Sequence, residues 1–247
     1  MTEVRIVPPP RSPMSSRPPP TSDPVRETAS LQPPNCYRTR VKPGSLEYKE
    51  IERLLGSSTS RDIPLISQIE KIVSDALWDK YKSKKKSMTD ELRIGENLND
   101  RRLFIPCLSE DIEGIMRGNI HDCSISRILP KPFGPRYYFT SNASLCIQWC
   151  REYLAGSQVS LIVCQVLLGS STQGSHGLKE FPRRHDGKFY DSLVDNIDDP
   201  SVFVIENIDQ CYPAFVLDIL YAATPVMETQ AMLQGLIYLF ICNTIDG

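Results

Sequence analysis

The residue types that most often carry out enzyme chemistry are sparse in this chain. Its 247 residues include only three histidines, His121, His176 and His185, and eight cysteines. The last two histidines flank a loop rich in glycine, serine and arginine, which we interpret as a solvated excursion. No spacing pairs a cysteine with a histidine as nucleophile and base. The sequence also holds no phosphate-binding P-loop, no GxGxxG turn and no zincin helix.

The cysteines suggest either a metal site or disulfides, and neither interpretation fits well. Cys146 and Cys150 stand one helical turn apart, but no partner pair at zinc-ligand spacing accompanies them. We therefore expect no metal. The amino terminus contains no apolar segment of a secretory signal, so reduced, buried thiols are expected rather than disulfides.

Composition indicates a globular chain without a strong excess of either charge. The 28 Lys and Arg residues nearly balance 30 Asp and Glu, which argues against nucleic-acid binding by the protein as a whole. The most apolar stretch, GLIYLFIC at 235–242, is far shorter than the roughly 18–20 residues of a membrane span, so we expect no membrane partner. We expect an intracellular protein, in the nucleus or the cytoplasm. The lysines at 80–86 either close a helix or form a nuclear-import or nucleic-acid patch.

The first 35 residues have a different composition from the rest of the chain. They hold half of the 20 prolines, with PPP at 8–10 and again at 18–20. Proline fixes φ and removes a hydrogen-bond donor, so we predict a disordered Pro-rich tail over 1–35 with local polyproline II structure. Two interpretations stay open for it, a plain solvated tail and a PxxP ligand for an SH3-type partner.

The remaining chain predicts helices first and then strands with interleaved helices. Ser45 is expected to cap a first helix, and apolar residues at three- and four-residue spacing predict a second over about 64–83. Two later helices are predicted at 109–116 and 142–154. Short apolar runs predict strands at 102–106, 137–139, 161–168, 201–205 and 212–220. Pro213 should push the last strand towards a sheet edge. The fold class is therefore α+β.

Four blocks of sequence carry a more specific pattern. They are SLEYKEIERLL with ISQIEKIVSDALWDKYKSKKKSM, LFIPC, FGPRYYFTSNASLCIQWC, and FYDSLVDNIDDPSVFVIENIDQCYPAFVLDI. Together they resemble the catalytic domain of the poly(ADP-ribose) polymerase (PARP) family, in particular its mono-ADP-ribosylating branch and the PARP-like domain of the zinc-finger antiviral protein. The resemblance implies an ADP-ribosyltransferase fold of mixed β-sheets with flanking helices over 36–220. Residues 221–247 would then be a C-terminal extension of unknown structure.

The resemblance also implies a reaction and a site. Family members cut the nicotinamide–ribose bond of their co-substrate NAD and transfer ADP-ribose to an acceptor protein. Active members use a His that donates to the ribose, a Tyr that stacks on nicotinamide, and a third residue that is Glu in chain-forming enzymes. The corresponding residues here are Ile105, Tyr138 and Val202. Tyr138 keeps its role, whereas isoleucine and valine supply no polar group.

Three further positions belong to the same implied NAD site. Trp149 stands where a second stacking aromatic is usual. Pro106 replaces a Gly whose backbone N–H and C=O hold the nicotinamide amide, and proline has no N–H. Cys146 replaces a supporting Ser, and a thiol is a weaker partner. Glu206 lies four residues beyond Val202, about 13 Å along a strand, which is too far to replace the missing Glu.

Two hypotheses follow from the resemblance. In the first, the chain is a PARP-like protein with a degenerate NAD site, weakly active or inactive, that acts by binding a protein partner. In the second, it is an active NAD-dependent mono-ADP-ribosyltransferase, since Val202 excludes chain growth. The pair Ile105 and Pro106 distinguishes the two, because an active enzyme would not tolerate both.

Overall fold

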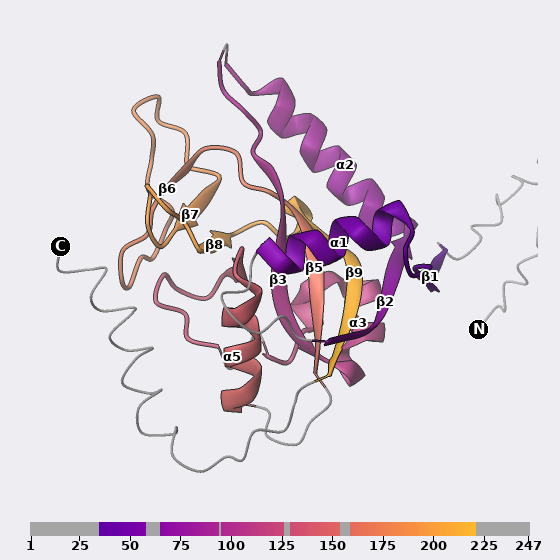
Figure 1. Cartoon of the computed structure of the whole chain (residues 1–247). Helices are drawn as coiled ribbons and strands as arrows, with labels where there is room; N and C mark the ends of the chain where they lie inside the picture. Colours follow the sequence, from indigo (N-terminus) through magenta and orange to yellow (C-terminus); the bar gives the residue numbers. More distant parts are fainter. Residues whose placement is uncertain (1–34, 58–64, 94, 126–128, 154–158, 221–247) are drawn as a thin grey trace, which may run out of the picture. The chain divides into compact units, whose positions relative to one another are not determined.

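A nine-stranded sheet forms the centre of the computed structural model, which describes residues 35–57, 65–93, 95–125, 129–153 and 159–220 (Figure 1). The strand order is β1-β2-β9-β5-β3-β4-β8-β7-β6. Within the described residues every neighbouring pair is antiparallel except β6 and β7, which are parallel. The sheet is therefore mixed, and the α+β prediction is confirmed. The predicted tail, apart from its last residue, and the predicted extension at 221–247 lie outside the described residues.

The strands and helices have the following bounds. The strands are β1 (Cys36–Arg40), β2 (Leu65–Ser74), β3 (Asp100–Leu108), β4 (Tyr137–Thr140), β5 (Val159–Leu167), β6 (Ser171–Gln173), β7 (Ser192–Val194), β8 (Val202–Ile205) and β9 (Cys211–Leu220). The α-helices are α1 (Leu46–Ser57), α2 (Asp75–Asp90), α3 (Ile112–Gly118) and α5 (Ala143–Tyr153). Three 3₁₀ turns accompany them, η1 (Ser109–Asp111), η2 (Asn119–Asp122) and η3 (Ile208–Gln210).

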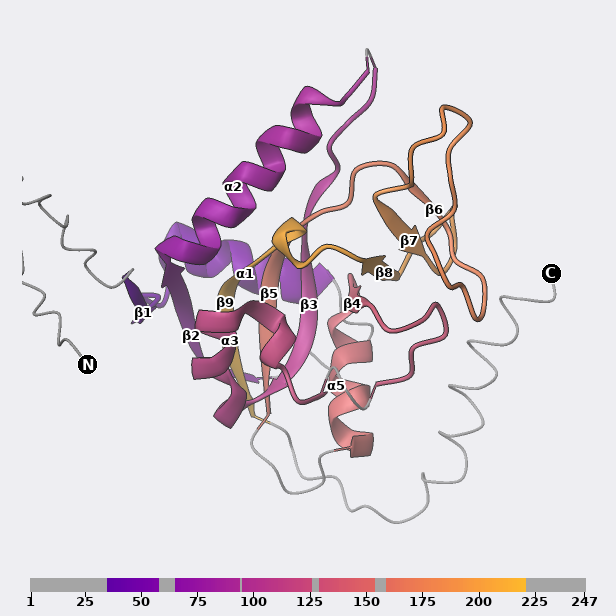
Figure 2. The ribbon, with the colours of Figure 1, turned by 180° about the vertical axis from the view of Figure 1, so that it is seen from behind.

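Helices cover both faces of the sheet, with α1 and α5 on one face and α3 on the other (Figures 1 and 2). Ile51 of α1 and Cys146 of α5 pack in one apolar cluster with Phe104 of β3. Ile115 of α3 packs in a second cluster with Ile105, the next residue of β3. Successive side chains of a strand point to opposite faces, so this alternation assigns neighbouring residues of β3 to different layers.

The predicted helix at 64–83 is wrong in its first half. The segment Leu65–Ser74 is strand β2, which pairs with β1 on one side and β9 on the other, and the helix begins only at Asp75. Ile69 packs in the cluster under α1, and Ile72 packs in the cluster under α3. A strand covered on both faces carries apolar residues at odd and even positions, and that pattern imitates helical spacing.

The expected edge position of the last strand is also wrong. Strand β9 lies between β2 and β5 in the interior of the sheet. Pro213 is opposite Cys164, directly beside a shift of register between Val163 and Cys164. Proline lacks the N–H that a regular ladder needs, so its place beside a local irregularity explains how an interior strand accommodates it.

Most other elements agree with the predictions. The hydroxyl of Ser45 accepts a hydrogen bond from the Tyr48 N–H at 3.2 Å, and Asn142 Oδ1 accepts one from the Leu145 N–H at 3.3 Å. Both are therefore helix caps, as expected. Among the described residues, no disulfide involves Cys36, Cys107, Cys123, Cys146, Cys164 or Cys211. Within the described residues no helix is both long enough and apolar enough to span a membrane.

Candidate functional site

Strands β4 and β8 bring two of the predicted site residues together. Tyr138 is opposite Val204, and Thr140 is opposite Val202. Tyr138 and Val202 are therefore diagonal neighbours on the same face of the sheet. Val202 is half-buried and packs against the apolar cluster that holds Tyr138.

Tyr138 is enclosed by its own protein. Its residue surface is only 6% exposed, and its ring stacks on Phe133 with the centroids 6.3 Å apart. Its hydroxyl accepts a hydrogen bond from the Phe133 N–H at 2.9 Å and donates one to the Gly134 carbonyl at 3.0 Å. Burial raises the pKa of Tyr138 to about 12. Both the ring and the hydroxyl of the predicted nicotinamide-stacking residue are thus engaged inside the fold.

Arg136, in the turn before β4, is a buried cation. Its side chain is 3% exposed, and its guanidinium donates to the carbonyls of Leu178 and Lys179 at 3.0 Å each and to that of Phe133. The guanidinium also lies over the Phe181 ring, 5.0 Å from the centroid. Phe181 belongs to the cluster that encloses Tyr138. Arg136 therefore ties the turn at 133–136 to the segment at 178–181, whose Phe181 packs in the cluster around Tyr138.

Glu206 lies beside this cation. Its Oε1 is 3.6 Å from Arg136 Nε, and its side chain is 63% exposed. The Nε atom is buried and has no hydrogen-bond partner among the described residues, so the contact with Glu206 is an ion pair without a hydrogen bond. The spacing along β8 predicts that Glu206 is too far from position 202 to replace the missing Glu of the site. The carboxylate of Glu206 instead pairs with the guanidinium of Arg136.

Ile105 and Pro106 lie on β3, away from the Tyr138 cluster. Ile105 is 1% exposed and packs in the cluster under α3. That cluster also contains Phe139 and Phe203, which follow Tyr138 and Val202 in their strands. Alternation along the strands therefore separates Ile105 from the other two positions of the predicted triad.

Pro106 and the two remaining predicted site residues, Cys146 and Trp149, also make contacts within the fold. Pro106 is buried, and its carbonyl accepts a hydrogen bond from the Cys123 thiol at 3.3 Å. Cys146 is fully buried in the cluster under α1 and α5. Trp149 packs against the two larger clusters and not against the one that holds Tyr138. The expected pairing of Tyr138 and Trp149 as two aromatic faces is thus not seen in these clusters.

The comparisons with known proteins agree with the sequence blocks that resemble PARP domains. A sequence model of the poly(ADP-ribose) polymerase catalytic domain matches residues 45–187, more than half of the chain. This chain belongs to the PARP family. Its α+β sheet with flanking helices is accordingly the structure of a PARP catalytic domain.

The relatives of this PARP domain carry names from the mono-ADP-ribosylating branch. Human protein mono-ADP-ribosyltransferase PARP12 is 25% identical over 84% of this chain and 29% of its own length. Human PARP11 is 27% identical over 70% of this chain and 56% of its own length, and human PARP14 is 28% identical over 76% of this chain. The chain therefore spans little more than half, or less, of the curated relatives that it matches.

Two open hollows are present on the described surface of the PARP domain. One, of about 430 Å³, lies along α2 and is lined by Asp79, Lys80, Ser83, Lys84, Ser87 and Asp209. The other, of about 590 Å³, shares Lys84 with the first and extends over the residues around Tyr190. Neither hollow is lined by any of the six predicted site residues. Among the described residues no cluster of His, Cys, Asp and Glu could hold a metal ion.

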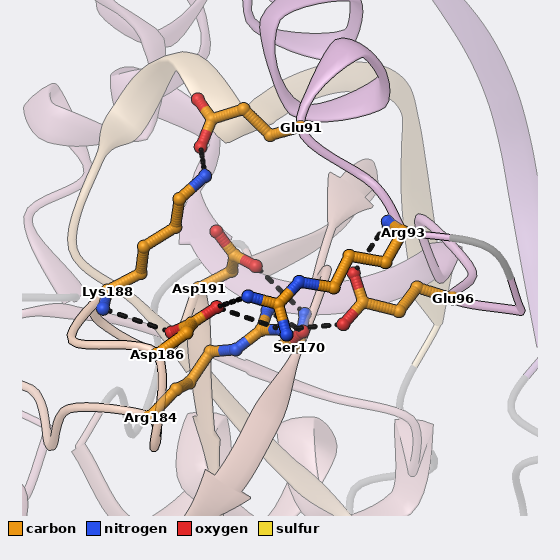
Figure 3. A network of polar contacts seen from close by, with 8 residues as sticks. All are labelled: Glu91, Arg93, Glu96, Ser170, Arg184, Asp186, Lys188 and Asp191. Carbon is orange, nitrogen blue, oxygen red and sulfur yellow. Dashed lines mark hydrogen bonds and ion pairs between the residues drawn. The ribbon is translucent and has the colours of Figure 1, made fainter.

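A polar network that the sequence analysis missed holds the segment at 184–191 (Figure 3). Arg184 donates to Glu96 at 2.5 Å and to Ser170 at 2.6 Å, and Arg93 pairs with Asp186 at 2.6 Å. The Arg93 N–H and then the Arg184 guanidinium lower the pKa of Glu96. The segment predicted to be a solvated excursion is therefore anchored to the chain after α2. The sequence signal was its cluster of charged residues, RRHDGK at 183–188.

The Arg136 contacts predict a measurable effect on the segment at 178–181. Replacing Arg136→Met keeps the length of the side chain but leaves three carbonyl oxygens without their donor. We expect the free energy of unfolding to fall by about 2 kcal/mol or more, because each buried polar group left unpaired costs about 1–3 kcal/mol. Hydrogen exchange, followed by mass spectrometry, should accelerate at 133–136 and 178–181. The control is Lys179→Met, an exposed side chain whose backbone carbonyl is retained. Unchanged exchange in Arg136→Met would show that the guanidinium does not hold the segment.

Proposed function

We propose that this PARP domain has a degenerate NAD site, is weakly active or inactive as a transferase, and acts by binding a protein partner. The observation that carries the proposal is the enclosure of Tyr138, the one triad position that keeps its expected residue. Its ring lies against Phe133, its hydroxyl is bonded on both sides, and the segment tied by Arg136 contributes Phe181 to the same cluster.

The side chains at the other positions support the same proposal. Ile105 has no donor for a ribose hydroxyl, Pro106 has no N–H for the nicotinamide amide, and the Cys146 thiol is a weak partner. Losing one hydrogen bond to a buried ligand group costs about 1–3 kcal/mol. Three such losses would weaken NAD binding by roughly 10²–10⁶-fold. The residues present therefore fit NAD poorly, and we assign no reaction step to them.

Access to Tyr138 adds a second cost. Nicotinamide can stack on the ring face of Tyr138 that Phe133 covers only if Phe133 moves away, and Phe181 packs in the same cluster. Movement of the 178–181 segment would break the hydrogen bonds from Arg136 to Leu178 and Lys179. The free energy of opening subtracts from whatever affinity NAD would otherwise have.

The proposal predicts that NAD does not stabilise the fold. A bound ligand raises stability by RT ln(1 + [L]/Kd), which vanishes when Kd exceeds the ligand concentration. We expect no change in Tm with millimolar NAD, measured by differential scanning fluorimetry. The matched control is the Tyr138→Ala variant with and without NAD. A clear rise of Tm in the parent protein that Tyr138→Ala abolishes would refute the proposal.

The proposal also predicts which substitutions restore NAD binding. The variant Ile105→His with Pro106→Gly restores the family residues at these two positions of β3 but leaves Tyr138 enclosed. Because position 105 faces the layer under α3, the new imidazole reaches a ribose beside Tyr138 only if the strand rearranges. Adding Arg136→Gly also removes the hydrogen bonds that tie the segment at 178–181 to the turn at 133–136. We expect the triple variant to bind NAD at least about tenfold more tightly than the double variant, because opening no longer opposes binding. Circular dichroism should first confirm that each variant folds, since residue 105 is buried. Equal affinity of the two variants would mean that Arg136 does not close the site.

The second candidate function is mono-ADP-ribosyl transfer, and the names of the relatives favour it. If transfer occurs, Val202 at the third position cannot polarise the hydroxyl on which a chain would grow, since its side chain neither accepts a proton nor carries charge. We predict single additions of ADP-ribose, detected by mass spectrometry of an acceptor protein incubated with NAD. A polymer ladder that a ribose–ribose glycohydrolase removes would contradict the position assigned to Val202.

A further inference from the structure

The larger of the two hollows is lined by none of the six predicted NAD-site residues, although its Phe181 also packs in the cluster around Tyr138. It measures about 590 Å³ and lies between α2, the start of β4, the segment at 181–191 and the η3 turn. This volume falls within the range of about 300–1,000 Å³ that is usual for ligand sites. The hollow is open rather than enclosed, so a side chain presented by another protein could enter it.

Aromatic rings form much of its wall. Tyr137, Phe181, Phe189 and Tyr190 line the hollow. Two of these rings already bind guanidinium groups within this chain. Arg136 lies over Phe181 at 5.0 Å, and Arg183 lies over Phe189 at 3.8 Å from the ring centroid. Cations are attracted to the faces of aromatic rings within about 6 Å. The aromatic rings of the wall can therefore bind a planar cation.

Two carboxylates add negative charge to the same wall. One oxygen of Asp191 accepts a hydrogen bond from the Ser170 N–H at 2.9 Å (Figure 3), and no ion pair within 4 Å engages this carboxylate among the described residues. Burial raises the pKa of Asp191 above its ordinary value, and Lys84 and Arg184 offset part of that shift, so a further cation close by would relieve the buried charge that remains. Glu206 is 63% exposed, and its nearest cation is the buried Arg136 on its inner side.

Opposing charge in the hollow is limited to one residue. Lys84 of α2 is the only cationic side chain that lines it, against the two carboxylates. Asn207 and Gln210 are neutral. The Gln210 amide donates hydrogen bonds to the backbone carbonyls of Leu167 and Asp191. The side chains that line the hollow carry two carboxylates and one ammonium, while Arg136 and Arg183 lie over two of its rings. The two carboxylates complement a cation rather than an anion.

We propose that this hollow binds an arginine side chain of a partner protein. The guanidinium is planar, so it stacks on aromatic faces and can present two parallel N–H groups to a carboxylate, which a lysine ammonium cannot do. The site is separate from the six residues of the predicted NAD site. Phe181 lines the hollow and also packs in the cluster around Tyr138, so the probe is tested in the absence of NAD.

The test uses the whole chain and a small probe. N-acetyl-arginine amide is titrated into isotopically labelled protein, and chemical shifts are followed by NMR. We expect shift changes centred on 189–191 and 206–210. N-acetyl-citrulline amide has the same shape without the charge, and we expect it to bind at least about tenfold more weakly. Inorganic phosphate should cause no shift changes in this region.

Two variants locate the interaction on the carboxylates. Asp191→Asn retains an acceptor for the Ser170 N–H, and Glu206→Gln retains the side-chain length. We expect each variant to lower the affinity for the arginine probe by at least about threefold. The matched control is Asp199→Asn, an exposed carboxylate outside the hollow that changes net charge equally. The proposal is overturned if citrulline binds as well as arginine, if phosphate binds instead, if shifts fall elsewhere, or if the two variants behave like Asp199→Asn.

Discussion

The buried guanidinium of Arg136 is the interaction on which the geometry of this site depends. A charge taken out of water must be compensated by hydrogen bonds and counter-charge, and this one has three carbonyls, an aromatic face and the carboxylate of Glu206. Because these partners come from the turn at 133–136 and the segment at 178–181, the two segments cannot separate without exposing or orphaning the cation. Phe133 and Phe181 are held in the same place, and Tyr138 is enclosed between them and its neighbours on β7 and β8.

A second constraint comes from the pleat of the sheet. Tyr138 and Val202 lie on one face of β4 and β8, whereas Ile105 lies in the layer under α3. A substitution at Ile105 therefore acts on a different apolar cluster from a substitution at Tyr138 or Val202. Pro106 adds a fixed φ and lacks an N–H, and its carbonyl is already bonded to Cys123. If the NAD site is degenerate as proposed, its repair requires changes in separate layers of the fold as well as release of the segment at 178–181.

Sequence reasoning predicted much of the architecture but little of the site geometry. Local patterns of apolar residues predict the strands at 102–106, 137–139 and 201–205. Local caps predict the helices that begin after Ser45 and Asn142. Strand β2 is not predicted by such patterns, because a strand covered on both faces shows no alternation. Pro213 could be placed correctly only with knowledge of the register shift beside Cys164. The residue types at positions 105, 106, 138 and 202 were readable from the family motifs. The enclosure of Tyr138 was not, since it depends on contacts from Arg136 to a segment more than 40 residues away in the chain.

We propose that the NAD site is closed and lacks its polar partners, and that a neighbouring hollow, which shares Phe181 with the cluster around Tyr138, binds a partner. The most direct measurement is isothermal titration calorimetry of a non-hydrolysable NAD analogue into the full chain. The account predicts no saturable heat of binding at millimolar analogue. A one-to-one isotherm with a micromolar Kd that disappears in Tyr138→Ala would contradict it.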